Sequence, residues 1–469
     1  MDGRRPALTP RKRNAIGRVG REILKMVRPT EKEMRTATFY ANEIMGRLKE
    51  AAPKDVEIIL AGSVARGTQV RGSSDIDIFL LFPKSMDERK MEMQGLRIAK
   101  GIVNGRRNES YVVKYAEHPY VRLLLNDMNI SADIVPAFKI GSAEEMGSAV
   151  DRTQLHNLFV NEKLSNRQRD DVRILKTFLN ARNIYGAEAR VEGFSGYLCE
   201  LLVHHYGSFA GVLEAFAHAK VPLVVDPLNR GKELQDRAGL VKRFGGSIIV
   251  IDPTDRNRNV AANVSGESLG RFIMAAGSFI RNPAKKEFLG TGFSGTDSMA
   301  KVNKLEEELG VDLYALCLKV PDMTEDILWQ QLKRLRVAIL RELDRNGFAA
   351  LLSLQELGDR EALLAFFIKR CENRSAVVRG PSAFMGGAVD LFVKSHQKSV
   401  LMYMDSDRVL SLERPRFTKP DKLLRSIISQ NNINFPSYIS KKRARLYING
   451  MPEHYAKMLY TALQLKMLR

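Results

Sequence analysis

The chain has 469 residues, 44% of them hydrophobic, and a net charge of +20, because 74 Lys and Arg outnumber 54 Asp and Glu. This length predicts about three domains, and the charge favours a polyanionic partner such as nucleic acid over a basic surface that serves solubility alone. Three widely spaced cysteines exclude a disulfide framework and a zinc site, and no apolar run is long enough to cross a membrane. We therefore expect a cytoplasmic protein.

The first 150 residues alternate between helix and strand patterns. Residues 1–28 are strongly basic, and we expect either a loose arm that touches RNA or a solvated tail. Thr30 and Glu33 form a capping-box sequence, which predicts a helix running to about Ala51. Strands are predicted at 56–60, 75–80, 110–116, 120–125 and 128–138. This alternation predicts a mixed α/β module that ends near residue 150.

The remainder divides into a helical part and a mixed part. Residues 151–282 are predicted to form a mainly helical second domain, and 283–469 an α+β third region. A linker is predicted at 290–298, from its Gly and Ser content. Helices are predicted at 168–181, 196–206, 212–218, 268–280, 326–344 and from about 453, and strands at 247–251, 348–354, 363–368 and 400–404.

The most informative motif is Gly62-Ser63 followed by Asp75-Ile76-Asp77. Side chains at i and i+2 of a strand point the same way, so Asp75 and Asp77 share one face. Two adjacent carboxylates repel each other, and Mg²⁺ bound together with substrate phosphates relieves that repulsion. Ser63 is expected at a helix N-terminus, where backbone N–H groups and its hydroxyl can hold a phosphate.

Asp133 supplies a third carboxylate in another apolar strand. Three carboxylates on adjacent strands are typical of two-metal phosphoryl transfer, in which one ion activates the attacking hydroxyl and another stabilises the leaving group. Alternatively, Asp75 and Asp77 cap a turn and Asp133 ends a strand, but this does not explain why all three interrupt apolar strands. We predict that Asp75, Asp77 and Asp133 are catalytic and bind metal.

The motif resembles the DNA polymerase β-like nucleotidyltransferase superfamily, and the chain more narrowly resembles archaeal (class I) CCA-adding enzymes, which are tRNA nucleotidyltransferases. The resemblance is fainter in the C-terminal third, where RGPSAF (379–384) has Pro381-Ser382 in place of the family's frequent two prolines. Five blocks carry the resemblance: YAEHPYVR (115–122), ADIVPAF (132–138), AVDRTQLHN (149–157), YGAEARVEGFSGYLCELLVHHYGSF (185–209) and DPTDRNRNVAANVS (252–265).

This resemblance implies an architecture and an activity. The architecture is an α+β multi-domain fold, with a polymerase β-like catalytic head of mixed sheet (1–150), a helical central domain (151–282) and an α+β C-terminal body and tail (283–469). The activity is template-independent addition of C, C and A to the 3′ end of immature tRNA, from CTP and ATP with Mg²⁺. A poly(A) or oligoadenylate polymerase of the same superfamily is the alternative. The implied partner is tRNA, held by its acceptor stem and T arm, and the family is commonly dimeric.

The resemblance also assigns nucleotide-binding residues. Ser63 and Arg66 would bind the triphosphate, Arg258 would face the incoming base, and the pocket would be lined by Thr153, His156, Lys176 and Tyr185. All of these except Ser63 have a structural alternative: Arg66 solvated, Thr153 an N-cap, His156 structural, Lys176 on an exposed helix face, Tyr185 a packing residue, and Arg258 paired with Asp255. Candidate tRNA contacts are residues 1–28, the polar side of 326–344, and KKRAR at 441–445.

Overall fold

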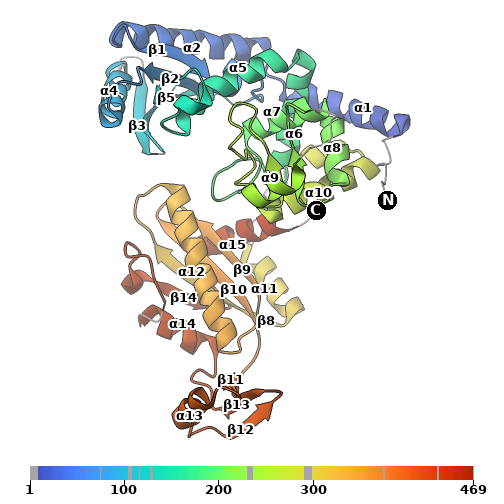
Figure 1. Cartoon of the computed structure of the whole chain (residues 1–469), viewed down its shortest axis with the longest axis vertical. Helices are drawn as coiled ribbons and strands as arrows, with labels where there is room; N and C mark the ends of the chain where they lie inside the picture. Colours follow the sequence, from blue (N-terminus) through green and yellow to red (C-terminus); the bar gives the residue numbers. More distant parts are fainter. Residues whose placement is uncertain are drawn as a thin grey trace. The chain divides into compact units, whose positions relative to one another are not determined.

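The computed structural model describes residues 9–73, 75–103, 108–115, 117–126, 130–229, 236–289, 298–372, 375–429 and 433–467. The chain divides into two compact units, residues 1–292 and 293–469. In Figure 1 the first unit runs from blue to yellow-green and the second from yellow to red. The predicted three-domain division stays a prediction.

The first unit begins with a mixed five-stranded sheet. Its β2–β5 pair is parallel and its other pairs are antiparallel. The strands, in spatial order, are β1 (Glu57–Ala61), β2 (Asp75–Phe82), β5 (Ile130–Phe138), β4 (Pro119–Leu125) and β3 (Glu109–Tyr115). The strands predicted from the apolar runs are confirmed.

Two helices cover one face of this sheet. Helix α2 (Glu31–Ala51) starts at the predicted Thr30–Glu33 capping box, and α4 (Glu88–Gly101) follows β2. Both contribute buried side chains to a core shared with Ile76, Ile78 and Leu80 of β2. The alternate residues of β2 therefore face the other side, and these include Asp75 and Asp77.

The rest of the first unit is mainly helical, as predicted. Its core is rich in aromatic side chains, and the Phe216 and Phe272 ring centroids lie 4.4 Å apart. This part also contains a short pair of parallel strands, β6 (Leu223–Val225) and β7 (Ile248–Val250), in addition to its helices. These are α1 (Pro10–Val27), α5 (Thr153–Lys163), α6 (Asn166–Asn180), α7 (Gly196–Tyr206), α8 (Phe209–Ala217), α9 (Arg237–Phe244) and α10 (Gly266–Arg281).

The basic leader is neither a loose arm nor a solvated tail over residues 10–27, so that expectation was wrong. Thr9 caps α1, and Pro10 occupies its first turn, where a missing N–H costs nothing. Ile16, Val19 and Ile23 are buried in the aromatic-rich core. The arginines lie on the opposite, exposed side of the helix, and residues 1–8 lie outside the described ranges.

The second unit is built on an antiparallel four-stranded sheet with the order β14-β8-β10-β9. Helices α12 and α14 pack on one face of this sheet, and α11 and α15 pack on the other. The strands are β8 (Val311–Lys319), β9 (Ala350–Leu357), β10 (Glu361–Lys369) and β14 (Arg445–Ile448), and the helices are α11 (Ser298–Leu309), α12 (Glu325–Arg345), α14 (Pro420–Ser429) and α15 (Glu453–Lys466). The predicted linker at 290–298 falls outside the described residues except for Ser298, which begins α11.

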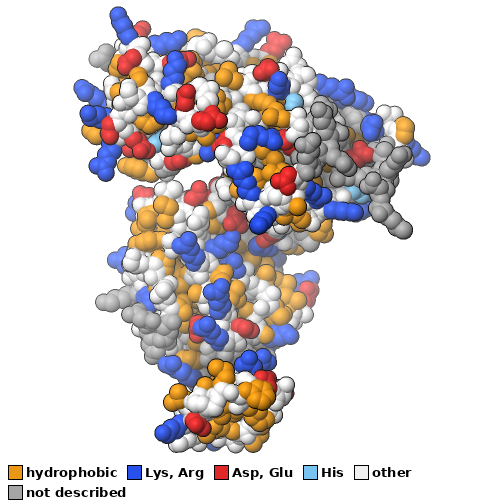
Figure 2. Space-filling view, viewed as in Figure 1, with side chains coloured by type: hydrophobic (Ala, Val, Ile, Leu, Met, Phe, Trp, Pro, Cys, Tyr) orange, Lys and Arg blue, Asp and Glu red, His pale blue; other side chains and the backbone are white. Residues whose placement is uncertain are grey.

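A smaller sheet forms one end of the second unit (Figure 1). It contains β11 (Ala376–Ser382), β13 (Arg408–Glu413) and β12 (Leu401–Asp405), in that order, with α13 (Gly386–Ser395) beside β11. Elsewhere in this unit, α12 exposes Arg334, Arg341 and Arg345, and Figure 2 shows basic side chains over this helix. Within the described ranges, no helix is long and apolar enough to cross a membrane.

The packing of α1 generates a stability prediction. Replacing Ile23 with Ala should lower the free energy of unfolding of the first unit by about 2–4 kcal/mol, because the change leaves a cavity in the core. Lys25→Ala, at an exposed position of the same helix, is the matched control and should change stability little. The measurement is denaturant unfolding of the intact chain. Equal stability of the two variants would mean that α1 is not part of this core.

Candidate active site

A glycine turn brings the end of β1 against β2. Gly62 begins the short helix α3 (Gly62–Ala65) with a φ of +68°, a conformation that favours glycine. A Cβ atom on Gly62 would lie 1.7 Å from Oδ2 of Asp77, so no other residue fits this approach. The turn thereby places α3, which carries Ser63, against the strand that holds Asp75 and Asp77.

The parallel pairing of β2 with β5 brings the three predicted aspartates to one sheet face. Asp77 lies directly beside Asp133 in the register, and Asp75 lies beside Ser131. Ser131 Oγ donates a 2.7 Å hydrogen bond to Asp75 Oδ1. Arg122 of β4 donates two hydrogen bonds to Asp133, of 2.7 and 2.6 Å, which hold its carboxylate in a bidentate pair.

Asp77 carries the least compensated charge of the three. Burial raises its pKa to about 6, and the charges of Asp133 and Asp75 add to this effect, while Arg66 and Arg122 oppose it. Carboxylate oxygens are the ligands that hard divalent cations prefer. The three carboxylates, together with the raised pKa of Asp77, therefore fit a divalent metal.

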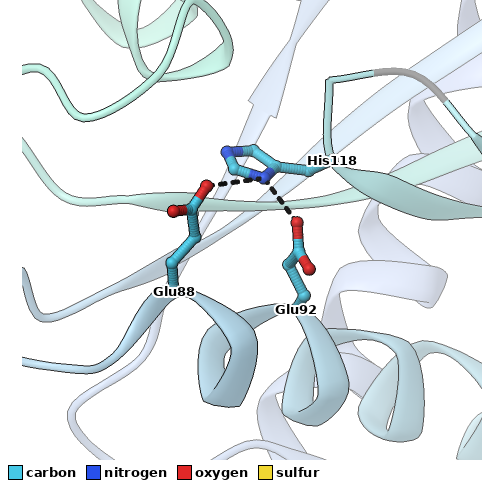
Figure 3. A group of neighbouring side chains, drawn as sticks. All are labelled: Glu88, Glu92 and His118. Atoms are coloured by element: carbon cyan, nitrogen blue, oxygen red, sulfur yellow. Dashed lines mark hydrogen bonds and ion pairs between the residues drawn. The ribbon is translucent and has the colours of Figure 1, made fainter.

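A separate cluster lies on the other side of the sheet, where α4 packs. Among the described residues, Glu88, Glu92 and His118 form the one group of metal-ligating side chains whose ligand atoms all lie within 4.8 Å of one another (Figure 3). The aspartate trio does not meet this criterion. His118 Nδ1 lies 2.8 Å from Glu92 and 3.7 Å from Glu88, so this contact ties the residue before β4 to α4.

Glu200 of α7 is a buried carboxylate whose contacts connect the mixed-sheet part of the first unit to its helical part. We call a buried carboxylate with several such partners a hub. Its carboxylate lies 2.9 Å from Nε of Arg66 and accepts a 2.5 Å hydrogen bond from Thr68 Oγ1. Lys176 Nζ lies 4.0 Å from the same carboxylate and donates to the Thr68 carbonyl at 3.0 Å. The structure thus brings Arg66 and Lys176 together, and neither is a solvated surface charge.

Lys176 and Tyr185 also meet. A Cβ atom on Gly196 would lie 3.3 Å from the Tyr185 hydroxyl and 3.5 Å from Lys176 Nζ, so both groups lie at the start of α7. Burial lowers the pKa of Lys176, although Glu200 opposes this, and burial raises the pKa of Tyr185. These shifts show that both groups lie in a poorly hydrated environment.

Asp252 forms a second buried hub. It lies 2.9 Å from His156 Nε2, accepts a 2.8 Å bond from Arg258 and a 3.2 Å bond from Tyr197, and also accepts from Thr254. Burial works to raise the pKa of Asp252, but the hydrogen bonds from His156 and Thr254 hold it below its usual range. Burial lowers the pKa of His156 against the influence of Asp252.

The geometry corrects two further structural alternatives, in addition to those for Arg66 and Lys176. Arg258 pairs with Asp252, whereas the Asp255 carboxylate accepts from Arg152 at 3.2 Å. Thr153 is the first residue of α5 and is not its N-cap. The nucleotide-binding roles of all seven residues stay predictions, namely those of Ser63, Arg66, Thr153, His156, Lys176, Tyr185 and Arg258.

Three functional candidates were missed from the sequence: Arg122, Glu200 and Asp252. All three lie in the blocks that carry the family resemblance. Arg122 and Glu200 interrupt apolar runs, in PYVRLLL and YLCELLV. A charged residue inside a predicted core segment is the signal that could have identified them, because burial of a charge requires a partner.

The mixed sheet, the glycine turn and the aspartate trio define a nucleotidyltransferase. Residues 41–156 match the sequence model for a nucleotidyltransferase domain, 170–289 that for the second domain of tRNA nucleotidyltransferase, and 310–445 that for the C-terminal domain of the CCA-adding enzyme. The chain belongs to the CCA-adding enzyme family.

Individual CCA-adding enzymes are similar in sequence to this chain over most of their length. The CCA-adding enzyme of Methanocaldococcus jannaschii is 32% identical over 454 residues, which cover 94% of this chain and 97% of that protein. The enzyme of Archaeoglobus fulgidus is 34% identical over 412 residues, covering 87% and 88%. Among solved structures, a cytoplasmic RNA terminal U-transferase matches 60% of this chain and 100% of its own, at a TM-score of 0.46 and 16% identity.

The raised pKa of Asp77 predicts a pH-dependent stability cost in metal-free protein. Above about pH 6 the Asp77 carboxylate is charged in the native state, and its unfavourable environment lowers the stability of the fold by the full amount. Between about pH 6 and pH 4 the native state binds a proton at Asp77 that the unfolded state does not bind. Stability should therefore rise as pH falls through this window. Asp77→Asn should be about 2–3 kcal/mol more stable than the parent at neutral pH.

Denaturant unfolding in the presence of a chelator measures this difference, and it should shrink towards zero near pH 4. Asp87→Asn is the control, since Asp87 is an exposed N-cap of α4, and its effect should not follow this pH profile. A stability difference between parent and Asp77→Asn that stays constant from pH 7 to pH 4 would contradict the assignment.

Proposed function

We propose that this chain adds C, C and A to the 3′ end of immature tRNA, using CTP and ATP without a nucleic-acid template. One observation carries the proposal: β2 and β5 place Asp77 beside Asp133, with Asp75 on the same face, in a chain whose family is that of the CCA-adding enzymes. The poly(A) alternative is not favoured, because residues 170–289 and 310–445 match tRNA nucleotidyltransferase and CCA-adding enzyme domains.

The three aspartates would hold Mg²⁺ at this face. When bound there, Mg²⁺ supplies neutralisation of the triphosphate charge and lowers the pKa of the attacking 3′-hydroxyl. Arg122 holds the Asp133 carboxylate in a fixed orientation through its bidentate pair. The hydroxyl attacks the α-phosphorus in line and pyrophosphate leaves, so positioning accounts for much of the rate.

The nucleotide would lie between the trio and the two buried hubs. Ser63 and Arg66 contact its phosphates, and the positive charge of Arg66 lies near enough to lower the pKa of Asp77. Thr153, His156, Lys176 and Tyr185 line the pocket, and Arg258, held by Asp252, faces the base. Glu200 and Asp252 act by fixing the positions of these cationic groups.

The proposed macromolecular substrate is tRNA, recognised through its acceptor stem and T arm by shape and backbone charge. Such binding weakens steeply as salt rises and depends little on sequence. The net charge of +20 supports it. We also propose a cytoplasmic location, which the cysteine content of the sequence favours, and a homodimer, which the family resemblance implies.

The central experiment offers CTP, ATP or both to a tRNA that lacks its 3′ CCA. We expect two C additions from CTP and one A addition once both C residues are present. Asp75→Ala and Asp77→Ala should each lower the rate at least about a thousandfold, with tRNA affinity changed by about twofold or less. Asp87→Asn should remain active. Long tails from ATP alone, or an active Asp77→Ala, would refute the proposal.

Asp252→Asn tests the second hub. The change keeps the shape but removes the charge that holds Arg258 and His156, so we expect KM for both nucleotides to rise roughly tenfold. The value of kcat should fall less. Asp255→Asn is the matched control in the same loop, because Asp255 pairs with Arg152 instead. Steady-state kinetics with unchanged KM values in Asp252→Asn would remove Asp252 from this role.

A further inference from the structure

A basic cavity of about 510 Å³ opens in the second unit between α14 and β14. It lies apart from the trio along the chain, and of the three basic segments identified in the sequence it includes only Ala444 of KKRAR. Its polar lining comes from Arg416, Lys422, Arg425, Ser426 and Ser429. Phe417, Ile428 and Leu446 contribute an apolar wall.

Helix α14 turns one face to the core and another to this cavity. Leu423, Leu424 and Ile427 are buried beneath the four-stranded sheet. Arg425 and Ser426 lie three and four residues after Lys422, and Ser429 lies four and three residues after them, so the four side chains form a single stripe along the helix. The core contacts of the helix therefore fix the direction in which the basic stripe points.

The described lining of the cavity is rich in cationic side chains. Among the described residues that line it, none is Asp or Glu, and the Arg416 guanidinium lies 5.2 Å from the Phe417 ring centroid. Within the described ranges, no ion pair engages Lys422 or Arg425. Arg443 and Arg445, on either side of Ala444, are exposed. Cations gathered in this way favour binding of an anion.

We propose that this cavity binds a backbone phosphate of tRNA. It would hold the substrate through residues that are far in the sequence from those of the active site. Guanidinium groups match phosphate oxygens in a bidentate geometry. The cations continue beyond the cavity to Arg443 and Arg445, which suits a chain of phosphates better than one free nucleotide. The inference rests on the proposed function for the identity of the RNA.

The test is tRNA binding by the intact chain, followed by fluorescence anisotropy over a range of salt concentrations with a tRNA lacking CCA. In the double variant Lys422→Gln and Arg425→Gln, affinity should fall about tenfold at moderate salt, and the slope of log Kd against log salt should decrease by about two. KM for CTP should stay unchanged. The control, Arg89→Gln with Lys90→Gln, removes the same charge from exposed positions of α4 and should have much less effect.

Ser429→Glu gives a second, independent variant, because it adds a carboxylate to the lining while leaving both cations in place. It should weaken tRNA binding at least as much as the double variant does. If the double variant does not unfold cooperatively, the tRNA affinity of Ser429→Glu is the result that tests the proposal. Parental affinity in Ser429→Glu, or equal weakening in the α4 control, would overturn the proposal. So would loss of CTP or pyrophosphate binding in equilibrium dialysis with tRNA affinity intact, which would indicate a site for free phosphates.

The binding measurement needs no turnover. A parent chain that binds tRNA through this cavity but does not extend it would refute the proposed function and leave the cavity assignment standing. If the double variant completes CCA normally and keeps the parental tRNA affinity and salt dependence, the cavity assignment is refuted and the proposed function stands.

Discussion

The parallel register of β2 and β5 is the constraint on which the site depends. Because Asp77 pairs directly with Asp133, their carboxylates share one face and repel each other. Neighbouring strands supply the compensation, through Arg122 on Asp133 and Ser131 on Asp75. A register shift of one residue would turn either aspartate towards the apolar core under α2 and α4. The hydrophobic face of β2 thus enforces the geometry of its acidic face.

The two hubs, Glu200 and Asp252, hold side chains in fixed positions in the helical part of the first unit. Glu200 and Asp252 are both inaccessible to solvent and each collects donors from separate segments of the chain. Burial of a charge is unfavourable unless partners and hydrogen bonds compensate it. Arg66 comes from the head, while Lys176 and Glu200 come from the helices, so the same contact that satisfies Glu200 also fixes the head against the helices. Stability and positioning therefore rest on the same atoms.

Local patterns predicted the strands of the first sheet and the helices α2, α6, α10 and α12, because alternation and capping are properties of neighbouring residues. The Thr30 capping box and the strand that holds Asp133 are examples. Local patterns did not predict α1 or α4. Contacts between distant segments were not predictable in this way. The burial of Ile16 and Ile23 was hidden by the surrounding arginines, and the Arg258–Asp252 pair could not be distinguished from an Arg258–Asp255 pair by spacing alone. Strand β8 was also missed, although it is central to the second unit.

Asp77 and Asp252 show how one residue type serves two purposes in a single unit. Donors surround Asp252 closely enough that its pKa falls despite burial, which suits a group that must stay charged and fixed. Among the described residues, no such set of donors surrounds Asp77, and burial raises its pKa to about 6. That unrelieved charge makes the metal-free protein less stable than it could be. Perturbed groups of this kind gather where a ligand completes the electrostatics, which supports the proposal that Asp77 takes part in binding a cation.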